Sequence, residues 1–228
     1  IHLNVCPQSI WLTPDGQWRL GGWGYSLEVE MSESSTPCPY FLSSGPGAMG
    51  GKAPPVGPSL TYAAPELSNA ATPGGAPAGL TPSADMFSVG LVLAELFKSS
   101  SSTPSGQYQP VLSFDATSPL AHRDAVVQLL SPGSLQGLFG SLSSQEPSVA
   151  QAVHALLSPN PAHRPDPSSV LTNAIFHQTG VTTLRRLDSL PALSQRDPTG
   201  VSSFLTGQLP GALALVMPPR LRRTAVLT

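Results

Sequence analysis

Few side chains of this sequence could bind a metal ion or act in nucleophilic catalysis, and they are scattered. Two cysteines, Cys6 and Cys38, form no CxxC pair and make neither a disulfide framework nor a zinc site. A serine–histidine–aspartate site is not indicated, because no G-x-S-x-G segment is present. His2 lies among apolar residues, where a histidine is more often packed than metal-bound. The remaining histidines have no ligand-like spacing: His122, His154, His163 and His177.

The first twenty residues predict the elements that would hold His2 and Cys6 in place. Residues 1–12 are mostly apolar, Thr13-Pro14-Asp15-Gly16 is a turn signal, and residues 17–20 have the composition of a short strand. This order predicts a loop, a strand, a turn and a second strand. We expect the rest of the chain to be mainly helical.

The clearest helix spans Ser83–Phe97, where apolar residues cover nearly every face. A helix that is apolar all round is a buried one, so we expect it at the centre of the core, with Ser83 as its N-cap. Further helices are predicted at 121–130, at 149–157, from Asp166-Pro167 onward, at 181–193 and at 201–209. Leu193, Pro198 and Gly200 are expected to mark the end of the helix at 181–193. Stretches rich in serine, proline and glycine predict irregular insertions at 31–59, 69–82 and 99–110.

Composition and charge exclude several classes of protein. Hydrophobic residues make up 40% of the chain, enough for a packed core, whereas charged residues make up 11%, against about 25% in ordinary domains. The net charge of −2 gives no global attraction to nucleic acid. No apolar stretch approaches the roughly 20 residues that a membrane-spanning helix needs. The sparse cysteines fit a reducing, cytoplasmic setting.

The charge is unevenly distributed along the chain. Residues 180–228 contain six arginines and two aspartates, so this segment is basic and the remainder is acidic. A basic segment could meet an acidic protein surface or lipid headgroups, which would allow peripheral association with a membrane. The alternative is a helix face whose charges are simply solvated.

The first twelve residues resemble the catalytic loop of protein kinases, I-H-R-D-L-K-P-x-N-I-L-L. They are Ile1-His2-Leu3-Asn4-Val5-Cys6-Pro7-Gln8-Ser9-Ile10-Trp11-Leu12. The histidine, the proline and the apolar positions match, and the catalytic positions do not. Asn4 stands where the family has its catalytic aspartate, and Ser9 stands where it has a metal-binding asparagine. Cys6 replaces a basic residue that lies near the transferred phosphate in the family.

Four further segments resemble kinase motifs in the same order and with matching local spacing. Gly22-Trp23-Gly24 follows Asn4 by 18 residues, like the DFG motif, and Gly22 takes the place of the aspartate that holds Mg²⁺. The other segments are 62–66, similar to the APE motif, 83–90, similar to the start of the central helix, and 156–165, similar to the late segment L-L-x-x-d-P-x-x-R-P.

The resemblance extends to about residue 176 and implies the helical C-lobe of a pseudokinase, with a short β-hairpin at its start, in residues 1–179. It places the other lobe, with its Gly-rich loop, upstream of Ile1. Among kinases the chain is most similar to the Scy-like pseudokinases of the clathrin-coat-associated branch, through N-V-C-P-Q-S-I, L-G-G-W and residues 184–190. In those proteins HEAT-like helical repeats follow, which implies a repeat beginning in residues 180–228.

The resemblance also assigns structural roles. It implies an ion pair between Glu66 and Arg164, since either charge would be costly to bury alone. Asp85 is expected to accept hydrogen bonds from the backbone around His2, because a buried carboxylate needs such partners. His2 and Trp23 are expected to stack in the core.

One residue is a candidate for cofactor binding. Trp11 occupies the position of the aliphatic residue that lies under the adenine ring in kinases. Its indole could partly fill that pocket as the floor of an adenine site, or it could simply pack. Because Ser9 and Gly22 replace both metal ligands, we expect no bound metal and no cofactor beyond weakly held ATP.

The resemblance therefore favours a catalytically inactive scaffold over an enzyme. Its expected partners are proteins, in particular coat and adaptor proteins, and not nucleic acid. Its expected location is the cytoplasm, at the periphery of the Golgi, endosomes or clathrin-coated vesicles, where Scy-like proteins act in membrane traffic. The alternative is a weakly active or atypical serine/threonine kinase that binds ATP.

Overall fold

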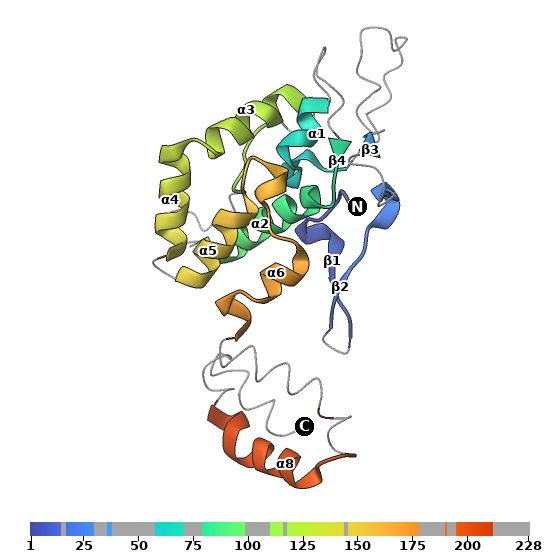
Figure 1. The fold of residues 1–228 in the computed structure, drawn as a ribbon, viewed down its shortest axis with the longest axis vertical. Coiled ribbons are helices and arrows are strands. Elements are labelled where there is room, and N and C mark those ends of the chain that lie inside the picture. Colours follow the sequence, from blue (N-terminus) through green and yellow to red (C-terminus); the bar gives the residue numbers. More distant parts are fainter. Residues whose placement is uncertain are drawn as a thin grey trace. The chain divides into compact units, whose positions relative to one another are not determined.

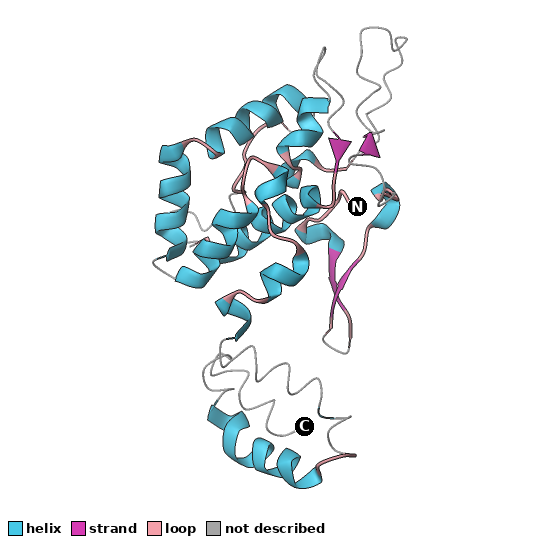
Figure 2. Ribbon diagram, in the orientation of Figure 1, coloured by secondary structure: helices cyan, strands magenta, loops and turns pink. Residues whose placement is uncertain are grey.

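The chain is mainly helical, as predicted, and divides into two compact units, Ile1–Val170 and Leu171–Thr228 (Figures 1 and 2). This boundary falls before the one expected after residue 179. The computed structural model describes residues 1–14, 17–29, 36–37, 58–70, 79–98, 110–115, 118–143, 146–177, 190 and 195–211. None of the helices formed by these residues has both the length and the apolar character needed to cross a membrane.

The first unit opens with the predicted loop and hairpin. A short 3-10 helix, η1 (Pro7–Ser9), leads into β1 (Ile10–Leu12), which pairs antiparallel with β2 (Trp18–Leu20). The backbone N–H of Thr13 donates to the Gln17 carbonyl at 2.9 Å and closes the turn side of the ladder. The chain then enters a second 3-10 turn, η2 (Trp23–Tyr25), at the predicted DFG-like position.

The predicted central helix is α2 (Ser83–Phe97), and its observed bounds are the predicted ones. Most of its residues are buried, and it packs against α5 (Pro147–Leu156), beside it in Figure 1. The two helices approach closely at Gly90, where an added Cβ would lie 2.9 Å from the Cβ of Leu156. The prediction of Ser83 as N-cap was wrong: Pro82 caps the helix, without a side-chain hydrogen bond.

Around α2 lie α3 (Pro119–Leu129) and α4 (Pro132–Ser143), which follow each other along the chain. Ser118 caps α3 by accepting a hydrogen bond from the backbone N–H of Ala121 at 3.2 Å, and proline at the first helical position fixes the local φ angle. The helices predicted at 121–130 and 149–157 correspond to α3 and α5. The sequence interpretation missed α4 entirely.

Two short strands join segments that the sequence interpretation assigned to separate insertions. β3 (Thr36–Pro37) pairs antiparallel with β4 (Gly79–Leu80), and α1 (Pro65–Ala70) extends into the stretch predicted to be irregular from residue 69. Most of the remaining residues of insertions 31–59, 69–82 and 99–110 lie outside the described residues. After α5 come η6 (Pro161–His163), α6 (Pro167–Leu171) and η7 (Ala174–His177).

In the second unit, after η7, the structure describes α8 (Pro198–Ser203), which continues as the π-helical η8 (Phe204–Gln208). Pro198 and Gly200 were expected to end the preceding helix. Instead they form the first turn of α8, because Asp197 caps it by accepting from the N–H of Gly200 at 2.8 Å. The helix predicted at 181–193 lies outside the described residues except for position 190.

Candidate functional site

The loop that precedes η1 is held by Asp85, in the first turn of α2. The backbone N–H groups of His2 and Leu3 donate to the two carboxylate oxygens of Asp85 at 2.7 and 2.8 Å. Leu3 has a φ of 62°, a left-handed conformation that costs a residue with a side chain about 1–2 kcal/mol. The hydrogen bonds predicted for Asp85 are therefore present, and they stabilise a strained turn of the loop.

His2 joins this loop to the segment after β2. Its Nδ1 accepts from the backbone N–H of Asn4 at 3.2 Å, so the ring proton is on Nε2, which donates to the Gly21 carbonyl at 2.9 Å. The His2 ring is buried, and it meets Trp23 edge to face with 4.5 Å between ring centroids. The predicted contact exists. Its predicted location in the core was wrong, because Trp23 covers His2 from outside and is 59% exposed.

The three positions that the resemblance to kinases assigns to catalytic residues, Asn4, Ser9 and Gly22, lie together beside this histidine. Gly22 has a φ of 78°, and a Cβ built on it would lie 3.3 Å from Nδ2 of Asn4 and 3.4 Å from Cβ of Ser9. The Ser9 hydroxyl donates to the Cys6 carbonyl at 2.8 Å and accepts from the Cys6 N–H at 3.1 Å. Cys6 is a buried free thiol whose Sγ lies 3.9 Å from Oδ1 of Asn4.

The chemistry available at this meeting point is that of neutral groups. Asn4 offers an amide, Ser9 offers a hydroxyl already engaged with the backbone, and Gly22 offers no side chain. Hard cations such as Mg²⁺ are held in proteins mainly by carboxylates. In the part of the chain that the structure describes, no three histidine, cysteine, aspartate or glutamate side chains gather where they could hold a metal ion.

Trp11 lies on the hairpin next to this site and is 63% exposed. A Cβ on Gly21 would come within 3.0 Å of the indole, so glycine at 21 leaves room for the Trp11 ring. The assignment of Trp11 to an adenine site stays a prediction. The sequence interpretation missed how much of the hairpin is exposed and apolar: Trp11, Leu12, Trp18 and Leu20.

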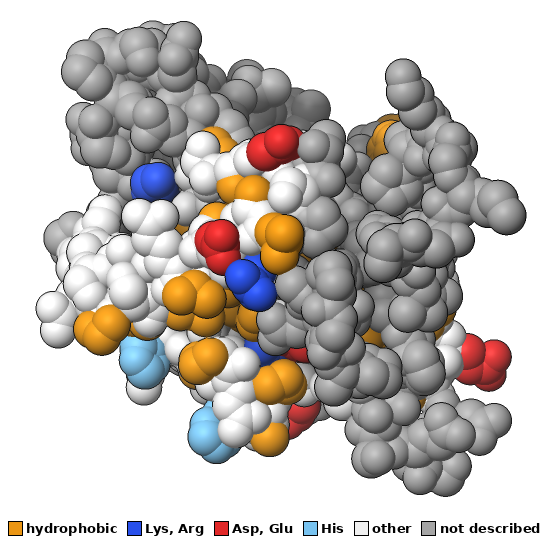
Figure 3. Space-filling model, turned by 90° about the horizontal axis from the view of Figure 1, so that it is seen from above, with side chains coloured by type: hydrophobic (Ala, Val, Ile, Leu, Met, Phe, Trp, Pro, Cys, Tyr) orange, Lys and Arg blue, Asp and Glu red, His pale blue; other side chains and the backbone are white. Residues whose placement is uncertain are grey.

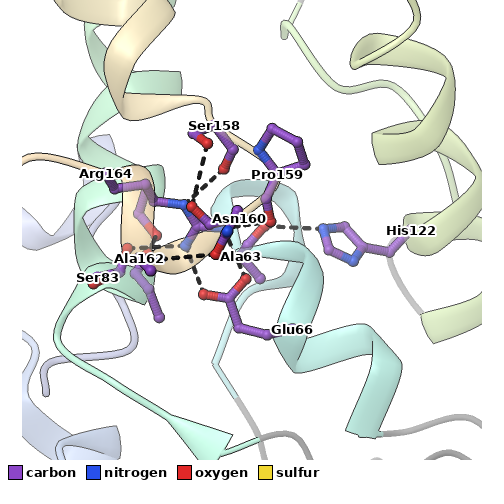
Figure 4. A network of polar contacts seen from close by, with 11 residues as sticks. Ala63, Glu66, Ser83, His122, Ser158, Pro159, Asn160, Ala162 and Arg164 are labelled. Atoms are coloured by element: carbon purple, nitrogen blue, oxygen red, sulfur yellow. Dashed lines mark hydrogen bonds and ion pairs between the residues drawn. The ribbon is translucent and has the colours of Figure 1, made fainter.

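A second polar cluster joins α1 to the segment after α5 (Figure 4). Its two charged residues, Glu66 and Arg164, are 98 residues apart in sequence. Both terminal nitrogens of Arg164 donate to Glu66, at 2.6 and 2.9 Å, in the bidentate arrangement that matches a guanidinium to a carboxylate. Arg164 also donates to the carbonyls of Ser83 and Ser158 at 3.0 and 2.8 Å. Its guanidinium lies over the Phe87 ring, 5.0 Å from the centroid.

His122 was expected to be an ordinary histidine, and the structure gives it an unusual environment. It is fully buried in α3, and its Nε2 lies 3.1 Å from the Ala63 carbonyl. Its Nδ1 has no hydrogen-bond partner within the described part of the chain. Burial lowers the pKa of His122 from 6.5 to about 4, against the opposing effect of the Ala63 hydrogen bond. The signal in the sequence is the helical spacing of His122, Val126 and Leu129, which all face inward.

On the side of the molecule seen in Figure 3, the described residues form no strongly charged patch. There the acidic and basic side chains are few and are interspersed with hydrophobic ones. The basic segment predicted in residues 180–228 has most of its arginines outside the described residues.

No family model matches this sequence, and the comparison with curated proteins found no match either. The kinase-like interpretation therefore depends on the sequence motifs and on where the fold places their residues.

Proposed function

We propose that this chain is part of a kinase-like scaffold that does not transfer phosphate. The observation that supports the proposal best is that Asn4 and Ser9 both lie beside Gly22, where an added Cβ would be 3.3 Å from Nδ2 of Asn4 and 3.4 Å from Cβ of Ser9. Asn4 and Gly22 are 18 residues apart in sequence, and the resemblance to kinases requires all three positions to share one site. Each carries a residue that cannot replace its kinase counterpart in catalysis.

The loss of catalysis follows from how phosphoryl transfer works. The reaction depends on positioning and on metal ions that neutralise the charge of the phosphates. A site whose side chains are an amide and a hydroxyl has neither an anionic metal ligand nor a carboxylate to accept the proton of the attacking hydroxyl. The contacts of Asp85 with the loop and of Arg164 with Glu66 stabilise the fold without any need for a metal.

We expect the full-length protein to transfer no phosphate from ATP. Purified protein would be incubated with labelled ATP and Mg²⁺ or Mn²⁺, and incorporation would be compared between the wild type and an Asn4→Ala variant. Both should match the protein-free background. Incorporation that rises above background and falls in Asn4→Ala, or on replacing an upstream strand lysine, would support the alternative of an atypical kinase.

The cellular part of the proposal is an adaptor role in clathrin-dependent traffic between Golgi, endosomes and plasma membrane. It comes from the similarity to Scy-like pseudokinases. The helical α8–η8 segment is compatible with a helical repeat, whose units must bury their apolar faces against neighbours.

Proximity labelling of the full-length protein in cells should enrich coat and adaptor proteins. A variant that lacks residues 180–228 and the repeats after them should lose this enrichment, because the repeats are the proposed docking element. The Asn4→Ala variant is the matched control and should retain it, since no catalysis is involved. Nuclear or ribosomal neighbours, or an unchanged set after the deletion, would contradict the adaptor role.

A further inference from the structure

α3 packs on the rest of the first unit through a single stripe of buried side chains. His122, Val126 and Leu129 follow each other at helical spacing and are buried, whereas Leu120 and Val127 on the other side are exposed. The helix packs against α1, α4 and the 3-10 turn η4 (Leu60–Tyr62). A peripheral helix with one buried stripe can separate locally at a lower free-energy cost than a core helix such as α2.

The polar contact within this stripe is made by His122. Figure 4 shows its ring directed from α3 toward the chain just before α1, where Nε2 donates to the Ala63 carbonyl at 3.1 Å. The opposite nitrogen, Nδ1, is buried and has no hydrogen-bond partner among the residues that the structure describes. The Phe114 ring lies 5.2 Å away, centroid to centroid. In this closed arrangement a proton added to Nδ1 would be a buried positive charge without an acceptor, which is costly.

No charged group on the surrounding elements bonds to this ring, within the described residues. On α3 itself Arg123 pairs with Asp124 at 3.4 Å on the surface. Tyr62 in η4 donates its hydroxyl to a carboxylate of α2 at 2.6 Å, and Glu66 in α1 binds a guanidinium. Asp115, before α3, is exposed, and α4 contains no titratable side chain. Among the described residues, the contacts of the His122 ring are with the Ala63 carbonyl and the Phe114 ring, and neither carries a negative charge that would stabilise a protonated His122.

We propose that His122 is an acid-sensitive latch: its neutral ring ties α3 to Ala63, and protonation of Nδ1 releases α3 from η4 and α1. Released, the ring can reach water, and the Ala63 carbonyl loses the donor that holds the chain just before Glu66. The latch is independent of the proposed scaffold function, since it lies outside the cluster of Asn4, Ser9 and Gly22.

The direction of the pH dependence follows from linkage. The pKa of His122 is about 4 in the closed state and about 6.5 once the ring is in water. The closed state is therefore fully favoured above pH 6.5, and that preference is lost as the pH falls toward 4. These two values predict that the opening equilibrium of α3 rises about 30-fold between pH 7.5 and pH 5.

Hydrogen exchange of the full-length protein, read by mass spectrometry and corrected for intrinsic rates, tests the latch. Protection of α3 amides should fall about 30-fold from pH 7.5 to pH 5, whereas protection in α2 and α5 should change little. His122→Gln, which cannot titrate, should abolish the fall. His154→Gln, at an exposed histidine of α5, is the matched control and should keep it. Equal protection of α3 at both pH values, or the same fall in His122→Gln, would overturn the proposal.

A second measurement covers the case in which His122→Gln does not fold. The wild-type protein, labelled with carbon-13 at histidine, would be titrated by NMR and the α3 exchange measured on the same samples. The His122 ring should remain neutral while α3 is protected and should become charged as that protection is lost. A ring that takes up a proton near pH 6.5 while α3 keeps its protection would also overturn the latch.

Discussion

Replacing Arg164 with alanine is expected to lower the free energy of unfolding by about 3–5 kcal/mol, the range for orphaning one partner of a buried ion pair. The substitution leaves the Glu66 carboxylate buried without the two N–H donors that now lie 2.6 and 2.9 Å from its oxygens. It also removes donors from the Ser83 and Ser158 carbonyls and contact with the Phe87 ring. Urea unfolding followed by circular dichroism measures the change.

The chain offers a matched control for this variant. Arg123 also forms an ion pair, with Asp124 at 3.4 Å, but both side chains are exposed. Arg123→Ala should therefore cost less than about 1 kcal/mol. The double variant Glu66→Ala with Arg164→Ala should cost less than the sum of the two single changes, since it leaves no orphaned charge. Equal effects of Arg164→Ala and Arg123→Ala would show that the buried pair does not stabilise the fold.

Replacing Asp85 with alanine should be the next most damaging change, at about 3 kcal/mol. The variant orphans the N–H groups of His2 and Leu3, which now donate to a carboxylate at 2.7 and 2.8 Å, and hydrogen bonds to a charged group contribute about 1.5–3 kcal/mol each. The left-handed backbone of Leu3 then loses the contact that compensates its strain.

The same urea titration, combined with hydrogen exchange of residues 2–6, separates loss of the loop from loss of the whole fold. Asp85→Asn should have a smaller effect, because the amide keeps one acceptor oxygen and places a donor against the other N–H. Asp124→Ala is the surface control and should change the free energy of unfolding by no more than about 0.5 kcal/mol. A loop that stays protected in Asp85→Ala would contradict the role given to this carboxylate.

Local patterns in the sequence predicted local structure well. The bounds of α2 followed from its apolar run, and α6 followed from an aspartate and a proline at its start. The same pair, Asp197-Pro198, begins α8, yet there the proline was interpreted as the end of a helix. α4 was missed because three glycines, at 133, 137 and 140, lower helix propensity by about 1 kcal/mol each, and packing compensates for them.

The candidate site could be predicted only in part, because its contacts join distant parts of the chain. Nothing in the spacing of Asp85 shows that it meets the N–H groups of His2 and Leu3. Only the resemblance to kinases suggested that contact and the pair of Glu66 with Arg164. The helical spacing of His122 with Val126 and Leu129 indicates that His122 lies on the buried face of a helix. That its Nδ1 has no hydrogen-bond partner among the described residues follows from how η4 and α1 pack against the ring, and a single sequence does not contain that geometry.

The Arg164 cluster has a consequence for how the length of this chain can vary. One guanidinium binds α1, the start of α2 and the end of α5, so these three junctions are fixed relative to each other by a few hydrogen bonds. Residues 71–78 and 99–109 lie between the junctions along the chain. In general, the entropy of closing a loop between two fixed ends grows only with the logarithm of the loop length, so doubling the length of a connection costs about 0.6 kcal/mol. A family that keeps this arginine and its three partners can therefore lengthen or shorten the stretches between them while the helices stay in place.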